Sequence, residues 1–487
     1  MTASATSITS SLPTGFDPNR TYRAAVIGAG SGGLTMAIGL AGFSHEVVLI
    51  EAGPVGGDCT NVGCVPSKAL LHAAAHSIED PFGYVRAKRD DLAGREEVEM
   101  DEHDTIHFLR GRARLTDQRS PHVVAVARPD GSEVEVRAEN VIICAGSKPV
   151  EFAIEGMPSE RVLTNETLFD LDEIPGRIVL IGGGAISLEM ATAFRDLDVE
   201  VHIVELANRL IGNDDPLVSS TIQAALEARG VIMHIGTSIE RFDAATNTVH
   251  LADGDQIDGV DYALLAVGRR PRLDGLGLDV AGVDHSPKGI VADDWGRTSV
   301  ERIWAVGDIT GNTLTTHGAN AIGRRAVRAI ALPYLLTTGS PRAMPNAVFC
   351  RPEIASVGIS VEEVASKNRA GRRRYEVHFA DTDRGYTDGV EHAVVMVDVE
   401  RFTGKVLRAA IVGPAAGEMI GLFTMAIDHG IGLRKMFGTV HPYPAYAQAI
   451  GKLVDDFARD TYPALPKEWF AMIRGRIFDR FRRRVSR

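Results

Sequence analysis

The apolar positions near the start of the chain form two short runs, separated by a glycine-rich turn and an amphipathic stretch. The segment AAVIGAGSGGLTMAIGLAG begins as an apolar strand, turns at Gly28, Gly30 and Gly33, and continues as a helix. The next apolar run, EVVLIEAG, carries the acid Glu51. Glycines in such a turn let the backbone approach a pyrophosphate, and the free N–H groups of the helix face it. Glu51 is placed to accept hydrogen bonds from a ribose, so the pattern predicts a dinucleotide site.

The same pattern occurs a second time. RIVLIGGGAISLEMATAF carries Gly182, Gly184 and Ser187, and the following strand VEVHIVEL contains Glu205. In both copies the acid lies 23 residues after the first glycine (28 to 51 and 182 to 205). One glycine turn can simply connect a strand to a helix, but two complete copies in the same register favour two bound dinucleotides. Ser187 replaces the third glycine, which predicts a helix slightly farther from its strand.

The acid of the second copy also bears on the choice of nucleotide. A carboxylate at Glu205 bonds a 2′-hydroxyl and repels a 2′-phosphate, which favours NADH over NADPH. Arg209 lies close by in the sequence and keeps NADPH open as the less favoured alternative.

Two cysteines follow the first nucleotide unit directly. In GGDCTNVGCVPSK, Cys59 and Cys64 are five residues apart. Pro66 cannot donate to the carbonyl of Val62, so we expect a helix that is broken here. A closed zinc site needs four ligands, which argues against metal binding by this pair alone. Two inert buried thiols are the other alternative, although Lys68 is placed to stabilise a thiolate.

Composition narrows the class of protein. The chain has 487 residues, which suggests two to four domains, and hydrophobic residues make up 45% of it. The net charge of −12 argues against nucleic acid as a partner. The sequence contains no run of 18 or more apolar residues, so it predicts no membrane span. Four cysteines argue against a disulfide framework, and a reducing cytoplasm is expected. Residues 1–19 resemble a disordered tail and not a signal peptide.

The last segment, residues 466–487, has a different character. It carries eight Lys or Arg residues against two acids, and its apolar side chains recur every four residues. This pattern predicts a basic amphipathic helix. The helix could lie on an anionic membrane surface or pack its apolar stripe on the body of a dimer. The residues that recur are Trp469, Ile473, Ile477, Phe481 and Val485.

Motifs along most of the chain resemble those of class I pyridine nucleotide–disulfide oxidoreductases, which include dihydrolipoamide dehydrogenase, glutathione reductase and mercuric reductase. GGDCTNVGCVPSK matches the family signature GGxCxNxGCxPSK, and VIICAGSKP, TSVERIWAVGD, VFCRPEIASVG and GKVLRAAIVGPAAGEMI follow in the family's order. The resemblance implies an α/β protein with two Rossmann-like dinucleotide-binding domains and an α+β C-terminal dimerisation domain. It implies an FAD-binding domain at 20–150 and 273–340, an NAD-binding domain at 151–272, and a homodimer interface at 343–465.

The resemblance also implies roles for particular residues. Hydride would pass from NADH to FAD, then to the Cys59–Cys64 disulfide, and finally to an acceptor. Cys64 would lie against the flavin as the charge-transfer thiolate, and Cys59 would face the substrate. Lys68 and Glu189 match the family's ion pair near the reactive edge of the flavin. The other positions implied to contact cofactor are Gly57, Ala113, Ala145, Gly146, Asp308 and Thr316 for FAD, and Gly268 for NAD. Cys144 and Cys350 are expected to be structural thiols, and no metal site is expected.

The C-terminal stretch HPYPAYAQ departs from the family pattern. Disulfide reductases of the family carry a histidine there, with a glutamate five residues later, and this pair shuttles the thiol proton. A gap-free alignment puts Tyr443 at the histidine position and Gln448 at the glutamate position. Shifting the frame to use His441 puts Tyr446 where the acid should be. A tyrosine near its reference pKa of about 10 is a poor base at neutral pH.

Three classes of function therefore stay open. The first is an FAD-dependent NADH:disulfide oxidoreductase that acts on a small-molecule acceptor. The second is a flavin reductase for a metal ion, a quinone or oxygen, although no cysteine follows Cys350, which argues against mercuric reduction. The third is a cofactor-bound binding module without turnover, against which the complete redox motif argues.

Overall fold

The computed structural model describes residues 12–13, 15–117, 120–312, 314–334, 343–367 and 371–462. The chain divides into two compact units. The first unit comprises residues 1–206 and 231–340, and the second comprises 207–230 and 341–487. The predicted basic helix at 466–487 and residues 1–11 of the predicted tail lie outside the described residues.

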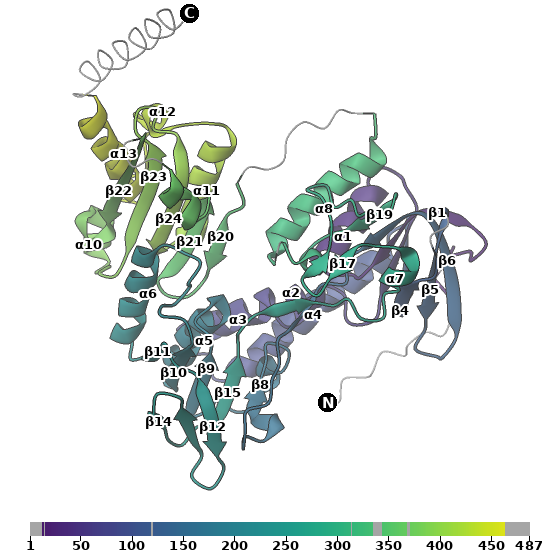
Figure 1. Ribbon diagram of the computed structural model, residues 1–487, viewed down its shortest axis with the longest axis horizontal. Helices are drawn as coiled ribbons and strands as arrows, with labels where there is room; N and C mark the ends of the chain where they lie inside the picture. Colours follow the sequence, from purple (N-terminus) through teal and green to yellow (C-terminus); the bar gives the residue numbers. More distant parts are fainter. Residues whose placement is uncertain are drawn as a thin grey trace, which may run out of the picture. The chain divides into compact units, whose positions relative to one another are not determined.

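The first unit contains a sheet with the strand order β3-β2-β1-β6-β5-β4, in which β19 also pairs with β6. Strands β1, β2, β3, β6 and β19 are parallel, and β4 and β5 are antiparallel to their neighbours. The core strands are buried because their residues are almost all apolar. The helices α1 and α8 lie beside each other next to this sheet (Figure 1). The bounds are β1 Thr21–Ile27, α1 Ser31–Ala41, β2 Val47–Glu51, β3 Ile106–Arg110, β4 Arg112–Leu115, β5 His122–Ala127, β6 Glu133–Ile143, β19 Ile303–Ala305 and α8 Thr316–Ala331.

A second parallel sheet in the same unit has the order β11-β10-β9-β15-β8. The antiparallel strands β12, β13 and β14 pack on it through a shared apolar cluster that includes Val179, Val204 and Phe242. Both predicted strand–turn–helix–strand patterns are therefore confirmed. The bounds are β8 Val162–Leu163, β9 Arg177–Ile181, α5 Ala185–Asp196, β10 Glu200–Glu205, β11 Ile232–Ile235, β12 Ile239–Asp243, β13 Thr248–Leu251, β14 Gln256–Ile257 and β15 Tyr262–Leu265.

The predicted break in the cysteine helix is also confirmed. Helix α2 (Gly57–Asn61) ends before Val62, and α3 (Cys64–Ala75) begins at the second cysteine. Pro66 is the third residue of α3, where a backbone N–H has no partner within the helix in any case. Gly63 is required at the break because a Cβ there would lie 2.8 Å from the carbonyl oxygen of Asp58.

Short elements connect the two sheets of the first unit. The antiparallel ribbon of β7 and β16 pairs Ser147 with Pro271 and Pro149 with Arg269. This ribbon lies close in sequence to the ends of β6 and β15, so it links the two nucleotide-binding sheets. The bounds are α4 Pro81–Asp101, β7 Ser147–Pro149, η1 Ser159–Arg161, η2 Leu168–Asp170, β16 Arg269–Pro271, α7 Leu278–Ala281, β17 His285–Ser286, β18 Gly289–Ile290 and η3 Asp308–Thr310.

The second unit is an antiparallel sheet with the order β20-β21-β24-β23-β22. Figure 1 shows α11 and α13 packed on this sheet, and their apolar faces join the strands in one core. The bounds are α6 Pro216–Ala228, β20 Asn346–Val348, β21 Glu353–Gly358, α9 Val361–Ser366, β22 Arg372–His378, η5 Phe379–Asp381, α10 Asp383–Thr387, β23 Val394–Glu400, β24 Val406–Gly413, α11 Ala416–Asp428, α12 Leu433–Met436 and α13 Gln448–Thr461.

Residues 207–230 pack with this second unit, although the sequence places them within the predicted NAD-binding range. Arg408 Nη2 donates to Asp214 Oδ1, and both side chains are buried, with exposed fractions of 7% and 6%. Arg374 bridges Asp215 and Asp398 at 2.7 Å to each. A buried carboxylate needs such a partner, so these ion pairs tie the segment to the sheet.

The prediction that the disordered tail extends to residue 19 is corrected by the structure. Phe16 stacks on Tyr22 with ring centroids 5.6 Å apart and packs against the core of the first sheet. The N–H of Asp17 donates to the hydroxyl of Tyr22 at 2.7 Å. Residues 15–19 are therefore anchored by an aromatic contact that the polar composition of the tail obscured.

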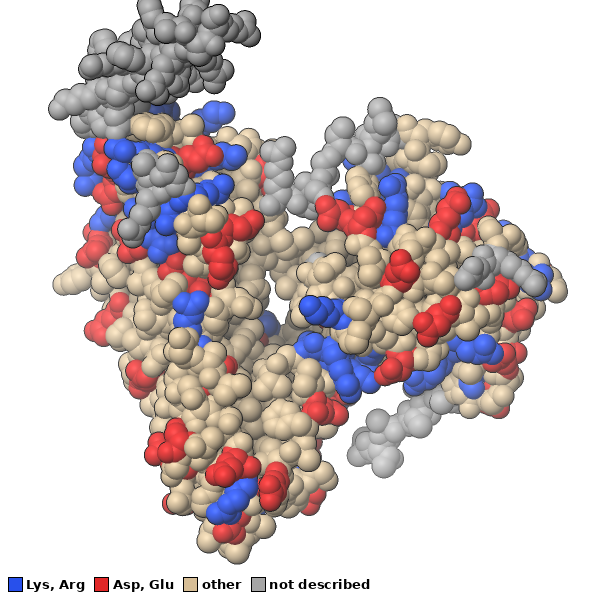
Figure 2. All heavy atoms as spheres, viewed as in Figure 1, with Lys and Arg blue, Asp and Glu red and all other residues tan. Residues whose placement is uncertain are grey.

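The charges on the surface are mixed. Figure 2 shows acidic and basic side chains interspersed over the visible face of each unit. Within the described ranges, no helix is both long and apolar enough to cross a membrane.

Candidate active site

The first glycine of each predicted nucleotide turn has a backbone conformation that favours glycine. The φ angle is +102° at Gly28 and +104° at Gly182. A Cβ at Gly28 would lie 2.4 Å from the carbonyl oxygen of Cys144, and a Cβ at Gly33 would lie 1.8 Å from the oxygen of Gly28. Close packing of helix, turn and neighbouring strand therefore depends on these glycines.

The two acids hold the turns in place. Glu51 accepts hydrogen bonds from the N–H groups of Ala29 and Gly53, both at 2.6 Å. Glu205 accepts from the N–H of Gly183, which is the position equivalent to Ala29 in the second copy. Each carboxylate thus fixes the turn of its own copy at the carboxyl edge of the sheet, where a dinucleotide binds in this type of fold.

The helices that follow the turns begin in the same way. Helix α1 begins after Gly30 and α5 after Gly184, and neither has a side-chain cap among the described residues. Their first N–H groups therefore remain available to a pyrophosphate. Gly57 lies against the first turn, because a Cβ there would be 2.7 Å from the Cα of Gly30. These residues fit a bound dinucleotide. Ser187, at the third-glycine position, is fully buried within α5.

The remaining predicted FAD positions lie in or beside the first sheet, whereas Gly268, predicted for NAD, follows β15 of the second sheet. Ser147 donates to Asp308 Oδ2 at 2.6 Å, and the N–H of Val150 donates to the oxygen of Gly268 at 3.0 Å. The ribbon of β7 and β16 thus brings the predicted FAD and NAD segments together. Ala113 is buried in β4, Ala145 and Gly146 follow β6, Gly268 precedes β16, and Asp308 begins η3.

The two predicted redox cysteines meet at one hydroxyl. Thr316 Oγ1, at the start of α8, lies 3.2 Å from Cys59 Sγ and 3.6 Å from Cys64 Sγ. A hydrogen bond from Cys59 lowers the pKa of Cys64 to about 6, with help from Thr316 and the charge of Lys68. The same hydrogen bond, together with burial, raises the pKa of Cys59. At neutral pH the negative charge therefore lies on Cys64 and the proton on Cys59.

The predicted ion pair is present next to these thiols. Lys68 Nζ donates to both carboxylate oxygens of Glu189, at 2.7 and 2.8 Å. The Glu189 side chain is only 8% exposed, whereas Lys68 is 38% exposed. The pair joins α3, which carries Cys64, to α5 of the second nucleotide unit. It fixes a positive charge on the redox helix, and this charge stabilises an anion at Cys64.

Several charged residues beside the cysteines were not singled out from the sequence. Asp58 precedes Cys59 and forms an ion pair with Arg269, and Arg272 lies 3.8 Å from the same carboxylate. The signals in the sequence were an acid within the glycine-rich cysteine motif and the segment RRPR directly after Gly268. No local pattern connects the two, because they are more than two hundred residues apart.

The stretch HPYPAYAQ (441–448), which differs from the family pattern, belongs to the second unit. Tyr443 is 71% exposed, and a hydrogen bond to Asp383 raises its pKa. Gln448 is the first residue of α13, and its Oε1 atom is buried without a partner among the described residues. The cysteines belong to the first unit, so a role for these two residues in proton transfer stays a prediction.

His441 and Tyr446, the two positions of the alternative alignment, contact residues of the second unit. The ring of His441 packs beside Gly451 on α13, 3.3 Å from where a Cβ would be. The Tyr446 hydroxyl donates to Asp388, and its ring packs on Phe379 at 6.1 Å.

The remaining cysteines have separate surroundings. Cys144 is buried, and desolvation raises its pKa. Cys350 is buried and donates to the carbonyl oxygen of Pro352 at 3.1 Å. Among the described residues, no group of three or more His, Cys, Asp or Glu side chains could hold a metal ion.

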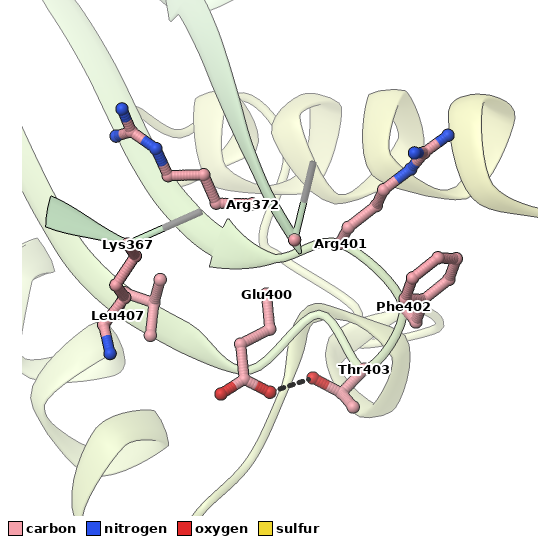
Figure 3. A pocket seen from close by; sticks show the side chains of 8 residues that line it. Lys367, Arg372, Glu400, Arg401, Phe402, Thr403 and Leu407 are labelled. Carbon is pink, nitrogen blue, oxygen red and sulfur yellow. Dashed lines mark hydrogen bonds between the residues drawn. The ribbon is translucent and has the colours of Figure 1, made fainter. Parts of the chain in front are cut away.

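A cavity of about 280 Å³ in the second unit does not form a converging site. It is lined by Lys367, Arg372, Glu400, Arg401 and Thr403 among others. Figure 3 shows the charged ends of the three basic side chains pointing away from one another, while Thr403 donates to Glu400 at 2.9 Å. Cations that diverge cannot bind one anion together.

These features define a class of protein that binds two dinucleotides beside a reactive cysteine pair. The pyridine nucleotide-disulphide oxidoreductase family matches residues 22–331, and the dimerisation domain of the same family matches residues 344–454. The chain belongs to this family and is an NAD(P)H-dependent flavoprotein oxidoreductase acting on sulfur groups.

Individual relatives agree with this membership. The chain is 30% identical over 457 residues to dihydrolipoyl dehydrogenase 3 of Haloarcula marismortui, covering 87% of this chain and 94% of the relative. It is 31% identical over 465 residues to a mercuric reductase of Streptomyces lividans, covering 90% and 97%. Among solved structures, the HOCl-induced flavoprotein disulfide reductase RclA of Escherichia coli matches with a TM-score of 0.81 and 26% identity, covering 89% and 99%. The dimerisation domain supports a homodimer.

Proposed function

We propose that the chain is an FAD-dependent NADH:disulfide oxidoreductase whose redox centre is the pair Cys59 and Cys64. The observation that carries this proposal is the shared contact of both sulfurs with Thr316, with the ion pair of Lys68 and Glu189 beside them. Bound FAD would supply the two-electron step between the nucleotide and the cysteine pair. Gly28, Gly30, Gly33, Gly57 and Glu51 would hold it in the first turn.

The unequal acidities of the thiols support a division of labour. Once reduced, Cys64 carries the thiolate and Cys59 carries the proton. Cys59 gives up this proton, attacks a sulfur of the substrate disulfide and releases one substrate thiol. Cys64 then attacks Cys59, the disulfide re-forms, and the second substrate thiol leaves. The two electrons pass to the substrate, and its two sulfurs take up the proton of Cys59 and one further proton from the solvent.

The proton step is where this chain differs from the family pattern. A histidine can accept the Cys59 proton at neutral pH because its pKa lies near 6.5. Tyr443 has a raised pKa because of its hydrogen bond to Asp383, so it keeps its own proton at neutral pH. We propose that Tyr443 donates a proton to a leaving substrate thiolate, that Gln448 helps to orient the substrate, and that neither residue acts as the base. Exchanging both residues for the family pair, Tyr443→His with Gln448→Glu, should then increase turnover of a disulfide.

We further propose NADH as the preferred nucleotide. The Glu205 carboxylate is held at the second turn by the N–H of Gly183, where it can accept from a 2′-hydroxyl. Arg209 donates to the oxygen of Gly212 at 2.5 Å, so its guanidinium is engaged within its own loop. A reducing cytoplasm would suit the reactive thiols, and the chain would act as a homodimer.

An anaerobic titration with NADH tests the redox centre. The FAD-loaded wild-type protein should accept four electrons per chain, two at the flavin and two at the disulfide. Cys59→Ser and Cys64→Ser should accept only two. Equal electron uptake by wild type and both variants would refute the disulfide mechanism.

A second candidate is reduction of a different acceptor, which the tyrosine at the proton-shuttle position favours. The mercuric reductase relative shows that the family includes metal-ion reduction. A panel of lipoamide, glutathione disulfide, coenzyme A disulfide, mercuric ion and quinones separates the candidates. Turnover of a quinone by the Cys59→Ser variant at the wild-type rate would favour the second function.

A further inference from the structure

The acid that precedes the first redox cysteine is held by two arginines distant in sequence. Arg269 Nη2 donates to Asp58 Oδ2, and Arg272 Nη2 lies 3.8 Å from Asp58 Oδ1. The Arg269 side chain is only 17% exposed, and Asp58 is 37% exposed. Burial raises the pKa of Asp58, and both arginines act against this rise. A partly buried guanidinium and carboxylate depend on each other for their hydrogen bonds.

The same guanidinium reaches the other end of the cysteine loop. Arg269 Nη1 donates to Asn165 Oδ1 at 3.2 Å, and Asn165 Nδ2 donates to the oxygen of Val62 at 3.1 Å. Arg269 Nε donates to Ser147 Oγ at 2.8 Å, and Ser147 donates onward to Asp308. One side chain therefore contacts three separate segments at once.

These contacts act where the helix is interrupted. Val62 lies in the break between α2 and α3, so regular helical hydrogen bonds do not continue from Cys59 to Cys64. Asp58 anchors the loop immediately before the first cysteine, and the oxygen of Val62 anchors it two residues before the second. The planar fork of an arginine can hold partners in several directions, which a lysine cannot do. We call Asp58, Asn165 and Arg269 the loop clamp.

We propose that Asp58 and Arg269 are positioning residues that hold the Cys59 and Cys64 sulfurs within reach of each other. This inference rests on the proposed function of the cysteine pair. Two thiols that are held close together form a disulfide more readily, because less orientational freedom is lost when the bond forms. Loosening the clamp therefore favours the dithiol and makes the disulfide easier to reduce.

The test is the equilibrium at a fixed, buffered pH between this cysteine pair and a reference dithiol–disulfide couple, which exchanges two electrons with it while the buffer balances the protons. It uses FAD-loaded protein, with FAD content and unfolding midpoint as checks of folding. Asp58→Asn and Arg269→Gln should each shift the equilibrium about tenfold toward the dithiol, which is a rise of about 30 mV in reduction potential. Asn165→Ala, which cuts only the branch to Val62, should give a smaller shift in the same direction. Arg270→Gln is the matched control, because Arg270 is the exposed next residue of the same strand.

The double variant Asp58→Asn with Arg269→Gln should shift the equilibrium no further than either single variant, because the two residues act as one contact. Equilibria within twofold of the Arg270→Gln control, or fully additive shifts, would overturn the proposal. Full recovery of the wild-type equilibrium by Arg269→Lys would also overturn it, because charge alone would then suffice. A wild-type protein without a reducible disulfide would instead refute the proposed function.

Discussion

Thr316 gives the sharpest test of the redox centre, because one hydroxyl contacts both sulfurs. The change Thr316→Val keeps the shape of the side chain and removes that contact. The thiolate of Cys64 loses a donor, so its pKa must rise. A hydrogen bond to a charged group contributes about 1.5–3 kcal/mol. Cys64 is exposed and the distance is 3.6 Å, so solvent screening leaves at most the lower limit of this range.

That limit corresponds to a shift of about one pKa unit. The pKa of Cys64 should therefore rise from about 6 to near 7. At pH 6.5 the thiolate fraction would fall from ~75% to ~25%. The assay is the rate of alkylation of the reduced protein by iodoacetamide as a function of pH, read at Cys64 by peptide mass spectrometry. Thr387→Val, which removes a hydroxyl from α10 of the other unit, is the matched control.

The reasoning would be refuted if Thr316→Val left the alkylation pKa of Cys64 unchanged or lowered it. A second consequence follows for stability. Between pH 6 and pH 9 the native state binds fewer protons at Cys64 than the unfolded state, whose thiol titrates near 9.0. The reduced wild-type protein should therefore gain stability relative to Cys64→Ser as pH rises through this window, and lose it as pH falls. Urea unfolding at several pH values measures this.

Three further predictions use other contacts. Lys68→Met should destabilise the protein by about 1–3 kcal/mol in urea unfolding, because a carboxylate that is only 8% exposed loses its partner while the lysine itself is partly solvated. Glu205→Gln should raise kcat/KM for NADPH relative to NADH by about tenfold in steady-state assays, and an unchanged ratio would contradict the predicted nucleotide preference. Arg408→Met should cost about 3–5 kcal/mol because Asp214 is left buried and unpaired, whereas Arg459→Met, at an exposed ion pair, should cost less than about 1 kcal/mol.

The periodic parts of the fold were predictable because their signals are local. Strand β1, the turn at Gly28 and helix α1 follow from apolar runs and glycine spacing over about twenty residues. The interruption of the cysteine helix was predicted from Pro66, although Pro66 lies in the first turn of α3 and the break itself is made at Gly63. The anchoring of Phe16 on Tyr22 was missed because a single aromatic residue in a polar tail gives no periodic pattern.

The assignment of residues 207–230 to the second unit could not be predicted from the sequence. Its order along the chain places this segment between two strands of the second parallel sheet. Its packing depends on the pairing of Asp214 with Arg408 and of Asp215 with Arg374, which lie more than 150 residues away. Ion pairs at such separations leave no spacing rule in the sequence.

The sequence by itself determined the chemistry that is available: two dinucleotide turns, a cysteine pair, and the lysine of the redox helix. Each of these is a short motif whose function depends on neighbours along the chain. The tertiary structure brought the two cysteines close enough for the hydrogen bond that makes their acidities differ, and it added the hydroxyl of Thr316 from α8. It also placed Arg269 against Asp58. The pKa values and the positions of the cysteines depend on burial and on neighbouring charges. Folding brings these neighbours together from distant parts of the chain, so the local sequence does not reveal them.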